Sequence, residues 1–414
     1  MKDNQAKYPQ LRFKGFTDPW EQCKLNEITN HRGGTAIEKY FEKDGQYKVI
    51  SIGSYGLDGK YVDQHIRAIS NKVTDGRVVH AGELTMVLND KTANGTIIGR
   101  SLLIEQDNKY VINQRTEIIA PKENFDSEFA FTILNGSFRE KVKRIIQGGT
   151  QIYVNYPAVA DLSLELPNIE EQQKIGAFFQ ELDATITLHQ RKLAKLKELK
   201  QGYLQKLFPK NGSKFPQLRF AGFADAWEQR KLGEIAIRVR GNDGRMNLPT
   251  LTISAGNGWM DQRDRFSQNI AGKEQKNYTL LRQGELSYNH GNSKLAQFGA
   301  VFELESYNEA LVPRVYHSFS VTAGAQPKFI EQMFATHRPD RELRKLVSSG
   351  ARMDGLLNIN YDDFMGIKVW LPSVAEQQAI AGLLVKLDNT IALHQRKLEK
   401  LQELKKGYLQ KMFC

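Results

Sequence analysis

The chain has 414 residues, 40% hydrophobic and 25% charged, so it is long enough for roughly two to four globular domains. Its 58 Lys and Arg residues outnumber 47 Asp and Glu, giving a net charge of +11 that favours nucleic acid or an anionic surface. Two distant cysteines exclude a disulfide framework and a cysteine-rich zinc site, and they fit a reducing cytoplasm. The polar N-terminus and the lack of long apolar runs predict neither a signal peptide nor a membrane span.

The most informative feature is an internal duplication. The segment 8–22 returns as 215–229, and the segment 166–208 returns as 371–413, with most positions identical. The sequence Leu-His-Gln-Arg-Lys-Leu is unchanged at 188–193 and 393–398, whereas the stretches between the repeated blocks share little. A duplicated frame around two divergent inserts predicts one scaffold that presents two different recognition surfaces, related by approximate two-fold symmetry. Such a scaffold suits a long, asymmetric ligand.

The first insert has the pattern of an α/β domain. Strand composition, interrupted by Asp, Gly and Asn turns, predicts strands at 47–52, 83–88, 96–105 and 110–120. An amphipathic segment then predicts a helix at 127–146. Trp20, at the start of the domain, stands in Asp-Pro-Trp, a fragment of an amino-methyltransferase motif. The second copy reads Asp-Ala-Trp227, so we interpret both tryptophans as core residues.

A long helix follows each insert. Between 170 and 208, residues at alternating steps of four and three form the a/d seam of a coiled coil, which His189 and Lys200 interrupt, and the second copy repeats it. At 1.5 Å per residue, each helix is about 55 Å long. Two such apolar stripes favour pairing of the helices, antiparallel if a domain lies between them. The alternative is that each helix packs on its own domain.

A joint and the second insert come between the two helices. Pro209 and the polar run 210–214 predict the end of the first helix and a flexible joint. Strands are predicted at 248–253, 285–289, 297–304 and 310–321, followed by a helix at 327–347. Gly-Glu-Leu occurs at 82–84 and again at 284–286, so we expect the two inserts to share one fold.

This organisation resembles a known family. Two variable domains, each followed by a near-identical helix that opens with Leu-Pro-x-x-x-Glu-Gln-Gln at 166–173 and 371–378, resemble the specificity subunit of type I restriction-modification systems. The Trp-Glu-Gln-x-Lys-Leu openings at 20–25 and 227–232 support the resemblance, which covers essentially the whole chain. It implies an α/β fold of two target recognition domains, 1–165 and 210–370. Two spacer helices, 166–209 and 371–414, would pair as an antiparallel coiled coil with pseudo-two-fold symmetry.

The resemblance also implies a function and partners. Each target recognition domain would read one half of a bipartite site on double-stranded DNA, and the coiled coil would set the unread spacer. Two modification subunits would bring S-adenosylmethionine and methylate adenine, and restriction subunits would use ATP and Mg. This chain would bind no cofactor and would be a non-catalytic subunit.

Candidate DNA-contacting residues lie in predicted loops that mix Arg or Lys with Asn, Gln, Ser or Thr. Arg fits guanine, Asn and Gln fit adenine, and small polar groups hold phosphates. In the first insert they are His31, Arg32, Thr35, Asn89, Lys91, Asn94, Gln114, Arg115, Gln147, Thr150 and Gln151. In the second they are Arg238, Arg240, Asn242, Tyr288, Asn289, His290, Asn292, Lys294, Arg314 and Arg352. For each residue, the alternative is an ordinary solvated loop side chain.

The sequence offers no catalytic or metal constellation. His189 and His394 lack further ligands at suitable spacing, which favours polar seam positions that set the helix register. Glu-Leu-Lys at 198–200 and 403–405 resembles the end of a nuclease motif, but it belongs to the helical repeat. Two alternative functions remain open. One is an enzyme that acts on DNA alone, and the other is a structural adaptor whose inserts recognise peptides.

Overall fold

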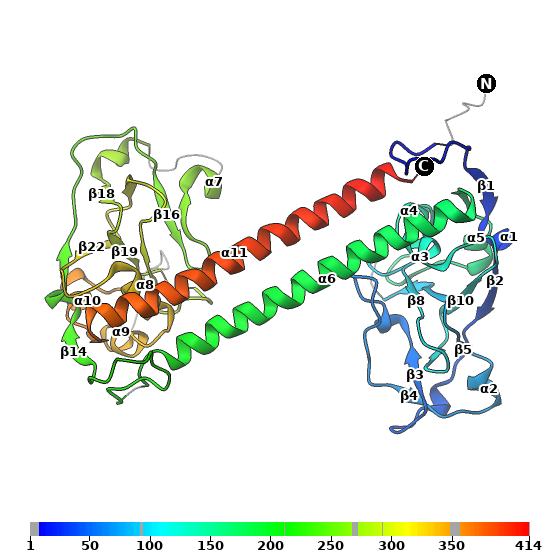
Figure 1. Ribbon diagram of the computed structural model, residues 1–414, viewed down its shortest axis with the longest axis horizontal. Helices are drawn as coiled ribbons and strands as arrows, with labels where there is room; N and C mark the ends of the chain where they lie inside the picture. The colour runs from blue at the N-terminus through cyan, green and yellow to red at the C-terminus, as the bar shows by residue number, and fades with distance from the viewer. Residues whose placement is uncertain are drawn as a thin grey trace. The chain divides into compact units, whose positions relative to one another are not determined.

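The structure, a computed structural model, describes residues 8–91, 94–210, 212–266, 272–291, 293–347 and 357–413. The chain forms two compact units (Figure 1). Unit 1 comprises Met1–Gln190 together with Arg396–Cys414, and unit 2 comprises Arg191–Gln395. Each unit therefore contains one insert and a stretch of each long helix. The domain and spacer-helix boundaries predicted from the sequence divide the chain differently, and they remain a prediction.

Unit 1 is built on a four-stranded antiparallel sheet in the order β2-β10-β6-β8. A second four-stranded sheet has the order β4-β3-β9-β5, and smaller sheets pair β1 with β13 and order β11-β12-β7. The strands are β1 (Glu21–Lys24), β2 (Thr29–Gly33), β3 (Tyr47–Ile50), β4 (Arg67–Ala68), β5 (Val78–Val79), β6 (Leu84–Val87), β7 (Asn89–Asp90), β8 (Ser101–Leu103), β9 (Tyr110–Ile112), β10 (Thr116–Pro121), β11 (Gln147–Gly148), β12 (Ile152–Tyr153) and β13 (Ser163–Leu166). The helices are α1 (Leu25–Ile28), α2 (Lys72–Asp75), α3 (Ser127–Asn135), α4 (Ser137–Lys143), α5 (Tyr156–Ala160) and the long α6 (Ile169–Lys206).

Unit 2 repeats the central sheet in the matching order β15-β22-β19-β20. The pairs β14-β23, β16-β17 and β18-β21 surround it. The strands are β14 (Glu228–Lys231), β15 (Ala236–Arg238), β16 (Leu251–Ser254), β17 (Gly258–Asp261), β18 (Thr279–Arg282), β19 (Leu286–Asn289), β20 (Ala300–Glu303), β21 (Glu309–Val312), β22 (His317–Val321) and β23 (Lys368–Leu371). The helices are α7 (Gln262–Phe266), α8 (Pro327–Ala335), α9 (Asp340–Leu346), α10 (Tyr361–Met365) and the long α11 (Val374–Lys411). The α/β class and the shared fold of the inserts are confirmed.

Two boundary predictions were wrong in the same way in both inserts. The strand predicted at 110–120 is two strands, β9 and β10, separated by a turn at 113–115, and the strand predicted at 310–321 is β21 and β22. Each predicted single helix is also two, since Gly136 separates α3 from α4 and a segment with Pro339 separates α8 from α9. The periodic pattern continues across both breaks, so it does not reveal them.

The seam predicted for the long helices is confirmed. In unit 1, Phe178 contacts Tyr408 with ring centroids 5.0 Å apart, and Asp183 accepts two hydrogen bonds from the Lys405 ammonium at 2.6 and 2.8 Å. Moving forward along α6 therefore moves backward along α11, so the helices pair antiparallel there. In unit 2, Lys200 forms the equivalent ion pair with Asp388 at 2.6 Å. The lysines that interrupt the seam are thus matched by carboxylates on the opposite helix.

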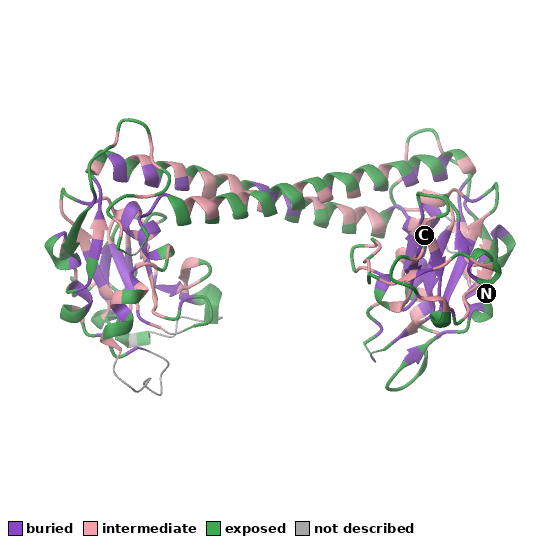
Figure 2. Cartoon of the chain, turned by 90° about the horizontal axis from the view of Figure 1, so that it is seen from below, coloured by how far each residue is buried: buried purple, intermediate pink, exposed green. Residues whose placement is uncertain are grey.

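Each unit encloses its own core of buried residues (Figure 2). An aromatic residue just beyond the end of a long helix packs into each core. In unit 1, Phe413, just beyond α11, packs against Trp20 and Phe179, with ring centroids 6.2 and 5.9 Å apart. In unit 2, Phe208, just beyond α6, packs against Trp227 at 5.9 Å. Both tryptophans are almost fully buried, which confirms their prediction as core residues. Each insert is therefore closed by the helix that follows the other insert.

The repeated motifs are explained by one buried ion pair in each unit. Arg12, in the first Gln-Leu-Arg-Phe, donates two hydrogen bonds to the carboxylate of Glu171 at 2.6 and 2.7 Å. Arg219 binds Glu376 in the same way at 2.8 and 2.7 Å. The two glutamate side chains are 0% and 1% exposed. The hydrogen bond to its glutamate raises the pKa of each arginine, so both guanidinium groups stay charged.

The next residue of each Glu-Gln-Gln motif fastens the helix to its insert. The Gln172 amide donates to the carbonyl oxygens of Asn124 and Pro167 and accepts from the backbone N–H of Asp126. Gln377 makes the equivalent three bonds to Gly324, Pro372 and Gln326 in unit 2. Buried polar groups that are fully paired in this way fix one geometry. The motif therefore orients each long helix on the sheet that precedes it.

We predict that Glu171→Gln destabilises unit 1, because the Arg12 guanidinium loses its buried counter-charge. Breaking one side of a buried pair costs about 3 kcal/mol at the lower end of its usual range. Urea unfolding of the full chain measures the loss. Glu170→Gln, an exposed neighbour in the same helical turn, is the control and should change stability little. Equal stability of the two variants would contradict this role for the ion pair.

Candidate nucleic-acid interface

The four polar loops predicted in the first insert meet at one edge of the central sheet. β2 and β6 both run antiparallel to β10, so the ends of β2 and β6 lie beside the start of β10. Thr35 forms a bridge with Asn113, and the backbone N–H of Leu88 donates to the Arg115 carbonyl at 3.0 Å. β7 then pairs with β12, and β12 with β11, which brings the segment 147–151 to the same edge. We name the segments 31–35, 89–94, 113–115 and 147–151 loop cluster 1, of whose members 92 and 93 lie outside the described residues.

Glycine and a buried amide hold the centre of loop cluster 1. A Cβ at Gly34 would lie 1.9 Å from the Asn113 carbonyl oxygen, so only glycine fits this close approach. The Asn113 side chain accepts from the backbone N–H groups of Ile37 and Gln114, and its amide donates to Glu38 at 2.9 Å. The hydrogen bond from the Asn113 amide, and to a lesser degree those from the backbone and from Gln114, lower the pKa of the Glu38 carboxyl. The turn at 113–115 is therefore rigidly supported from below.

Two predicted residues of loop cluster 1 are bound within the protein. His31 Nδ1 lies 2.7 Å from Glu117, and its ring lies 4.6 Å from that of Tyr156. Burial raises the pKa of the Glu117 carboxyl, and His31 opposes that shift. Arg32 donates to the Val78 carbonyl oxygen and to the Glu83 carboxylate, at 3.1 and 2.8 Å. Both side chains keep partial exposure, but their hydrogen bonds hold them against the sheet.

The remaining members of loop cluster 1 differ in exposure. Thr35 and Asn89 are half-buried, and Arg115 has φ +68°, a left-handed conformation that is uncommon for any residue except glycine. The exposed members are Lys91, Asn94, Gln114, Arg115, Gln147, Thr150 and Gln151. Apart from Lys91 and Arg115, their side chains are amides or a hydroxyl.

The second insert forms the equivalent edge. β15 and β19 both run antiparallel to β22, so the segments 238–242 and 289–294 meet the turn 313–316 that precedes β22. The segment 357–359 joins them, since the Leu357 backbone N–H donates to the His290 carbonyl at 2.9 Å. We name these four segments loop cluster 2. Asn292 and Arg352, predicted as DNA contacts, lie outside the described residues.

Three predicted residues of loop cluster 2 point inward. Tyr288 is 0% exposed, stacks on Phe364 with centroids 4.2 Å apart, and donates its hydroxyl to the Phe298 carbonyl. His290 is 5% exposed. Asn242 donates to the carbonyl oxygens of Arg245 and Gln275 and so closes its own turn. Tyr288 and His290, as placed, have no side-chain surface for a duplex, and we remove both from the interface.

The outward side chains of loop cluster 2 are cations. Arg238 lies over the ring of Tyr361 with its guanidinium carbon 4.1 Å from the centroid, and it remains exposed. Arg240, Lys294 and Arg314 are exposed as well. Asn289 is half-buried and accepts from the Gly291 backbone N–H at 3.0 Å. The two clusters thus lie at equivalent edges of the central sheets of the two units, but the side chains that they expose differ in chemistry.

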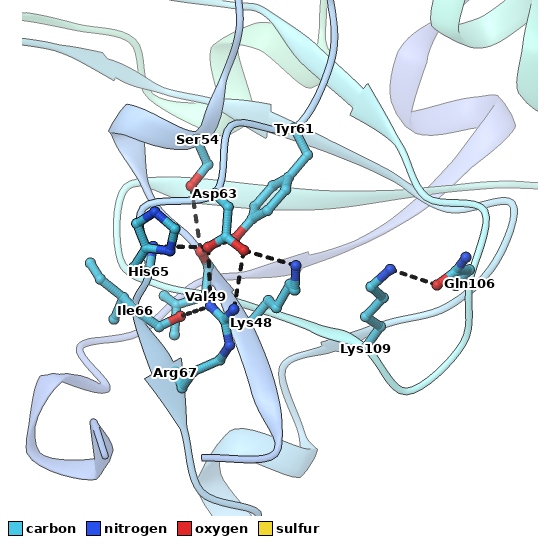
Figure 3. Close-up of polar contacts among 10 residues, drawn as sticks. All are labelled: Lys48, Val49, Ser54, Tyr61, Asp63, His65, Ile66, Arg67, Gln106 and Lys109. Atoms are coloured by element: carbon cyan, nitrogen blue, oxygen red, sulfur yellow. Dashed lines mark hydrogen bonds and ion pairs between the residues drawn. The ribbon is translucent and has the colours of Figure 1, made fainter. Parts of the chain in front are cut away.

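The carboxylates that support these loops were missed in the sequence, because acidic residues attract no attention in a search for DNA contacts. A second missed network surrounds Asp63 at the other end of β9 (Figure 3). Asp63 accepts from Lys48 at 2.8 Å and from Arg67 at 3.0 and 3.1 Å, and these cations hold its pKa well below the usual range. The Tyr61 hydroxyl donates to the Val49 carbonyl at 3.3 Å. This network fastens the segment 51–66 to β3 and takes no part in loop cluster 1.

No helix within the described part of the chain is long and apolar enough to cross a membrane. Among the described residues, no three His, Cys, Asp or Glu side chains are grouped so that they could hold a metal ion.

Comparison with known proteins identifies the kind of domain that carries these loops. Residues 17–198 match the model of the type I restriction modification DNA specificity domain. The chain is 26% identical over 195 residues to the type I restriction enzyme HindI specificity subunit of Haemophilus influenzae, a match that covers 46% of this chain and 40% of that one. It is 20% identical over 406 residues to the MjaVIII specificity subunit of Methanocaldococcus jannaschii, covering 94% and 91% of the two chains.

The fold agrees with these sequence matches. The crystal structure of a type I restriction-modification S subunit from M. genitalium superposes with a TM-score of 0.63, covering 98% of this chain and 99% of that chain at 14% identity. The match over 17–198 shows a DNA specificity domain in the first half of the chain. The resemblance to the specificity subunits of type I restriction-modification systems that the sequence indicated is thus confirmed.

We predict that Arg115→Gly weakens binding of the chain to its DNA target, at one base position, by about 1–3 kcal/mol. Glycine is chosen because it keeps the left-handed backbone at φ +68° and removes only the side chain. Competition binding with single-base variants of the target duplex measures the effect.

The matched control is Asn108→Gly. Asn108 is also exposed and left-handed, with φ +55°, but it precedes β9 whereas Arg115 follows it. It should leave affinity and base preference unchanged. A uniform loss across all sequences for Arg115→Gly would show a phosphate contact instead of base reading.

Proposed function

We propose that this chain is the non-catalytic subunit that reads an asymmetric, bipartite site on double-stranded DNA. The observation that carries the proposal is the pair of loop clusters, built at the same edge of the same sheet from segments whose side chains differ. Equivalent loops with identical chemistry would select two identical half-sites. Different chemistry at equivalent places suits two different half-sites.

The outward side chains support different base preferences for the two inserts. Loop cluster 1 presents Gln114, Gln147 and Gln151, whose amides pair bidentately with adenine. Loop cluster 2 presents Arg238, Arg240 and Arg314, whose guanidinium groups pair bidentately with guanine or hold phosphates. The net charge of +11 supplies the attraction for phosphate that is independent of sequence.

The long helices supply the spacer in this proposal. A helix of 38 residues is about 57 Å long, which exceeds the roughly 34 Å of one DNA turn. An antiparallel pair braced by Asp183–Lys405 and Lys200–Asp388 has a defined register. A fixed spacer between half-sites requires such a register, since a helix that slid would change the gap.

We propose two modification subunits as direct partners, because the repeated frame exposes matching apolar side chains twice. Tyr8 and Leu11 in unit 1 are 49% and 41% exposed, and the equivalent Phe215 and Leu218 in unit 2 are 51% and 39% exposed. The Leu11 and Leu218 backbone N–H groups donate to the Lys411 and Lys206 carbonyls, at the ends of α11 and α6. An exposed aromatic patch marks a protein contact, and two equal patches fit two copies of one partner.

The chemistry in this proposal belongs to the partners. The modification subunits bind S-adenosylmethionine and methylate adenine, and restriction subunits use ATP and Mg. This chain selects the DNA sequence at which these partners act.

The test is a map of methylated adenine across the genome of cells that express this chain with its modification subunit. The expected result is a new motif of two short, different blocks separated by a fixed unread gap. The control is the same cell without the chain. An active modification subunit that gains no motif from this chain, while another specificity chain directs it, would sink the proposal.

We predict that Tyr8→Ser and Phe215→Ser each remove one modification subunit from the complex and that the double variant removes both. The reason is that each patch would anchor one copy through its aromatic ring. Native mass spectrometry counts the copies. Leu57→Ser is the control, since Leu57 is 65% exposed but belongs to an insert and not to the repeated frame. Retention of both copies by the double variant would exclude these patches as the docking surface.

A further inference from the structure

His290 makes an unusual pair of hydrogen bonds at the end of β19. Its Nδ1 lies 2.7 Å from the Leu357 carbonyl oxygen, and its Nε2 lies 3.0 Å from the Val315 carbonyl oxygen. Carbonyl oxygens only accept, so both ring nitrogens must donate. A neutral imidazole donates from one nitrogen and presents a lone pair at the other, whereas the imidazolium donates from both. We propose that His290 is the charged positioning residue that holds loop cluster 2 in its DNA-reading geometry.

His290 joins the segments that form loop cluster 2. Its own position is in the segment 289–294, and its two ring bonds reach the turn 313–316 and the segment 357–359. Its carbonyl oxygen accepts from the Leu357 backbone N–H as well. Arg314, exposed in the turn 313–316, stands next to the carbonyl that His290 holds. Loss of one ring proton would leave a carbonyl facing a lone pair, and the loops that carry Arg314 and Lys294 would lose their common support.

Among the described residues, no carboxylate forms a hydrogen bond with the His290 ring. On β22, His317 stacks on it with centroids 5.0 Å apart and an interplanar angle of 9°, and donates to the Ile359 carbonyl. Burial lowers the pKa of His317 to about 4, so this ring is neutral beside the charged one. The other titratable or charged groups on the described parts of the packed elements are Tyr288 on β19, Arg238 on β15, Arg314 in the turn, Asp340, Arg341, Glu342, Arg344 and Lys345 on α9, and Tyr361, Asp362 and Asp363 on α10.

A consequence for pH follows from this arrangement. The proposal rests on the proposed function, since it assigns loop cluster 2 to DNA. The protonated ring supports the bound geometry, and arriving phosphates favour the positive charge. Affinity for the half-site read by the second insert is therefore greatest where both ring nitrogens are protonated, and it falls as rising pH removes one of the two ring protons. One proton limits the fall to about tenfold per pH unit.

The first insert has no histidine at the position of His290. Counting six residues from Gly82 and Gly284, which open the matching Gly-Glu-Leu sequences, places Leu88 where the second insert has His290. The loop that carries Asn94 is held instead by Arg139, which is 7% exposed and donates to the carbonyl oxygens of Gly95, Thr96 and Ile98. A guanidinium stays charged throughout the neutral range. The pH dependence that comes from His290 should thus affect the reading of one half-site and not of the other.

The first experiment observes the ring directly in the full chain. Nitrogen-15 NMR of histidine-labelled protein distinguishes an imidazolium from either neutral tautomer, and His290→Gln assigns the signal among the 8 histidines. We expect an imidazolium signal for His290 at pH 6 to 7, on DNA-free protein. A neutral tautomer there would overturn the proposal. This readout needs no DNA and does not depend on the proposed function.

The second experiment measures binding of the full chain, with its modification subunits, to a duplex that carries the mapped methylation motif. We expect the wild type to lose affinity by about three- to tenfold per pH unit above neutrality. His290→Leu, which installs the residue of the first insert, should bind more weakly but without this slope. Base changes in the first half-site should reduce affinity by the same factor at every pH.

The outcomes separate the two proposals. A variant that keeps the wild-type slope would overturn the role of His290 while leaving DNA reading intact. Absence of sequence-specific binding at every pH would overturn the proposed function, and the positioning role with it, even if the imidazolium signal were present. His290→Gln, whose amide still donates to one carbonyl, covers the case in which His290→Leu fails to fold, and it should also lose the slope.

Discussion

The buried pairing of one arginine with one glutamate determines how this molecule is put together. Arg12 with Glu171, and Arg219 with Glu376, join the segment before each insert to the first turn of the long helix after it. A charge removed from water is stable only beside a charge of opposite sign. Each pair therefore holds the start and the end of its insert next to each other. The glutamine that follows each glutamate adds three hydrogen bonds to the same junction. These junctions leave the chain between them free to vary.

The inserts use that freedom on one edge of a common sheet. Strand order and pairing in the central sheet are the same in both units. The exposed side chains at its edge are mostly amides in the first unit, beside Lys91 and Arg115, and mostly cations in the second. The supports beneath them differ as well, with Glu38, Asn113 and Arg139 in one and His290 in the other. The two inserts therefore differ in the buried side chains that support the loops as well as in the side chains that face outward. An outward side chain keeps one position only when the loop that carries it is held in place.

Within each unit, the end of the helix that follows the other insert closes the core. Phe413 completes the core around Trp20, and Phe208 completes the core around Trp227. A helix whose end is buried in a core cannot slide along its partner without exposing an aromatic ring to water. The ion pairs Asp183–Lys405 and Lys200–Asp388 oppose the same movement. The register of the helices is thus fixed by contacts at their ends as well as along the seam.

The sequence by itself determined the repeated frame, the long helices, their seam positions and the buried tryptophans. These features rest on local periodicity and on duplication, both of which are visible along the chain. Tertiary structure alone decided which polar loop residues face outward. Tyr288 lies in the four-residue strand β19 and His290 follows it. Their burial depends on α10 and on the segment 357–359, about seventy positions later in the chain. No local pattern at 288–290 records what covers it, because that contact exists only once the chain has folded.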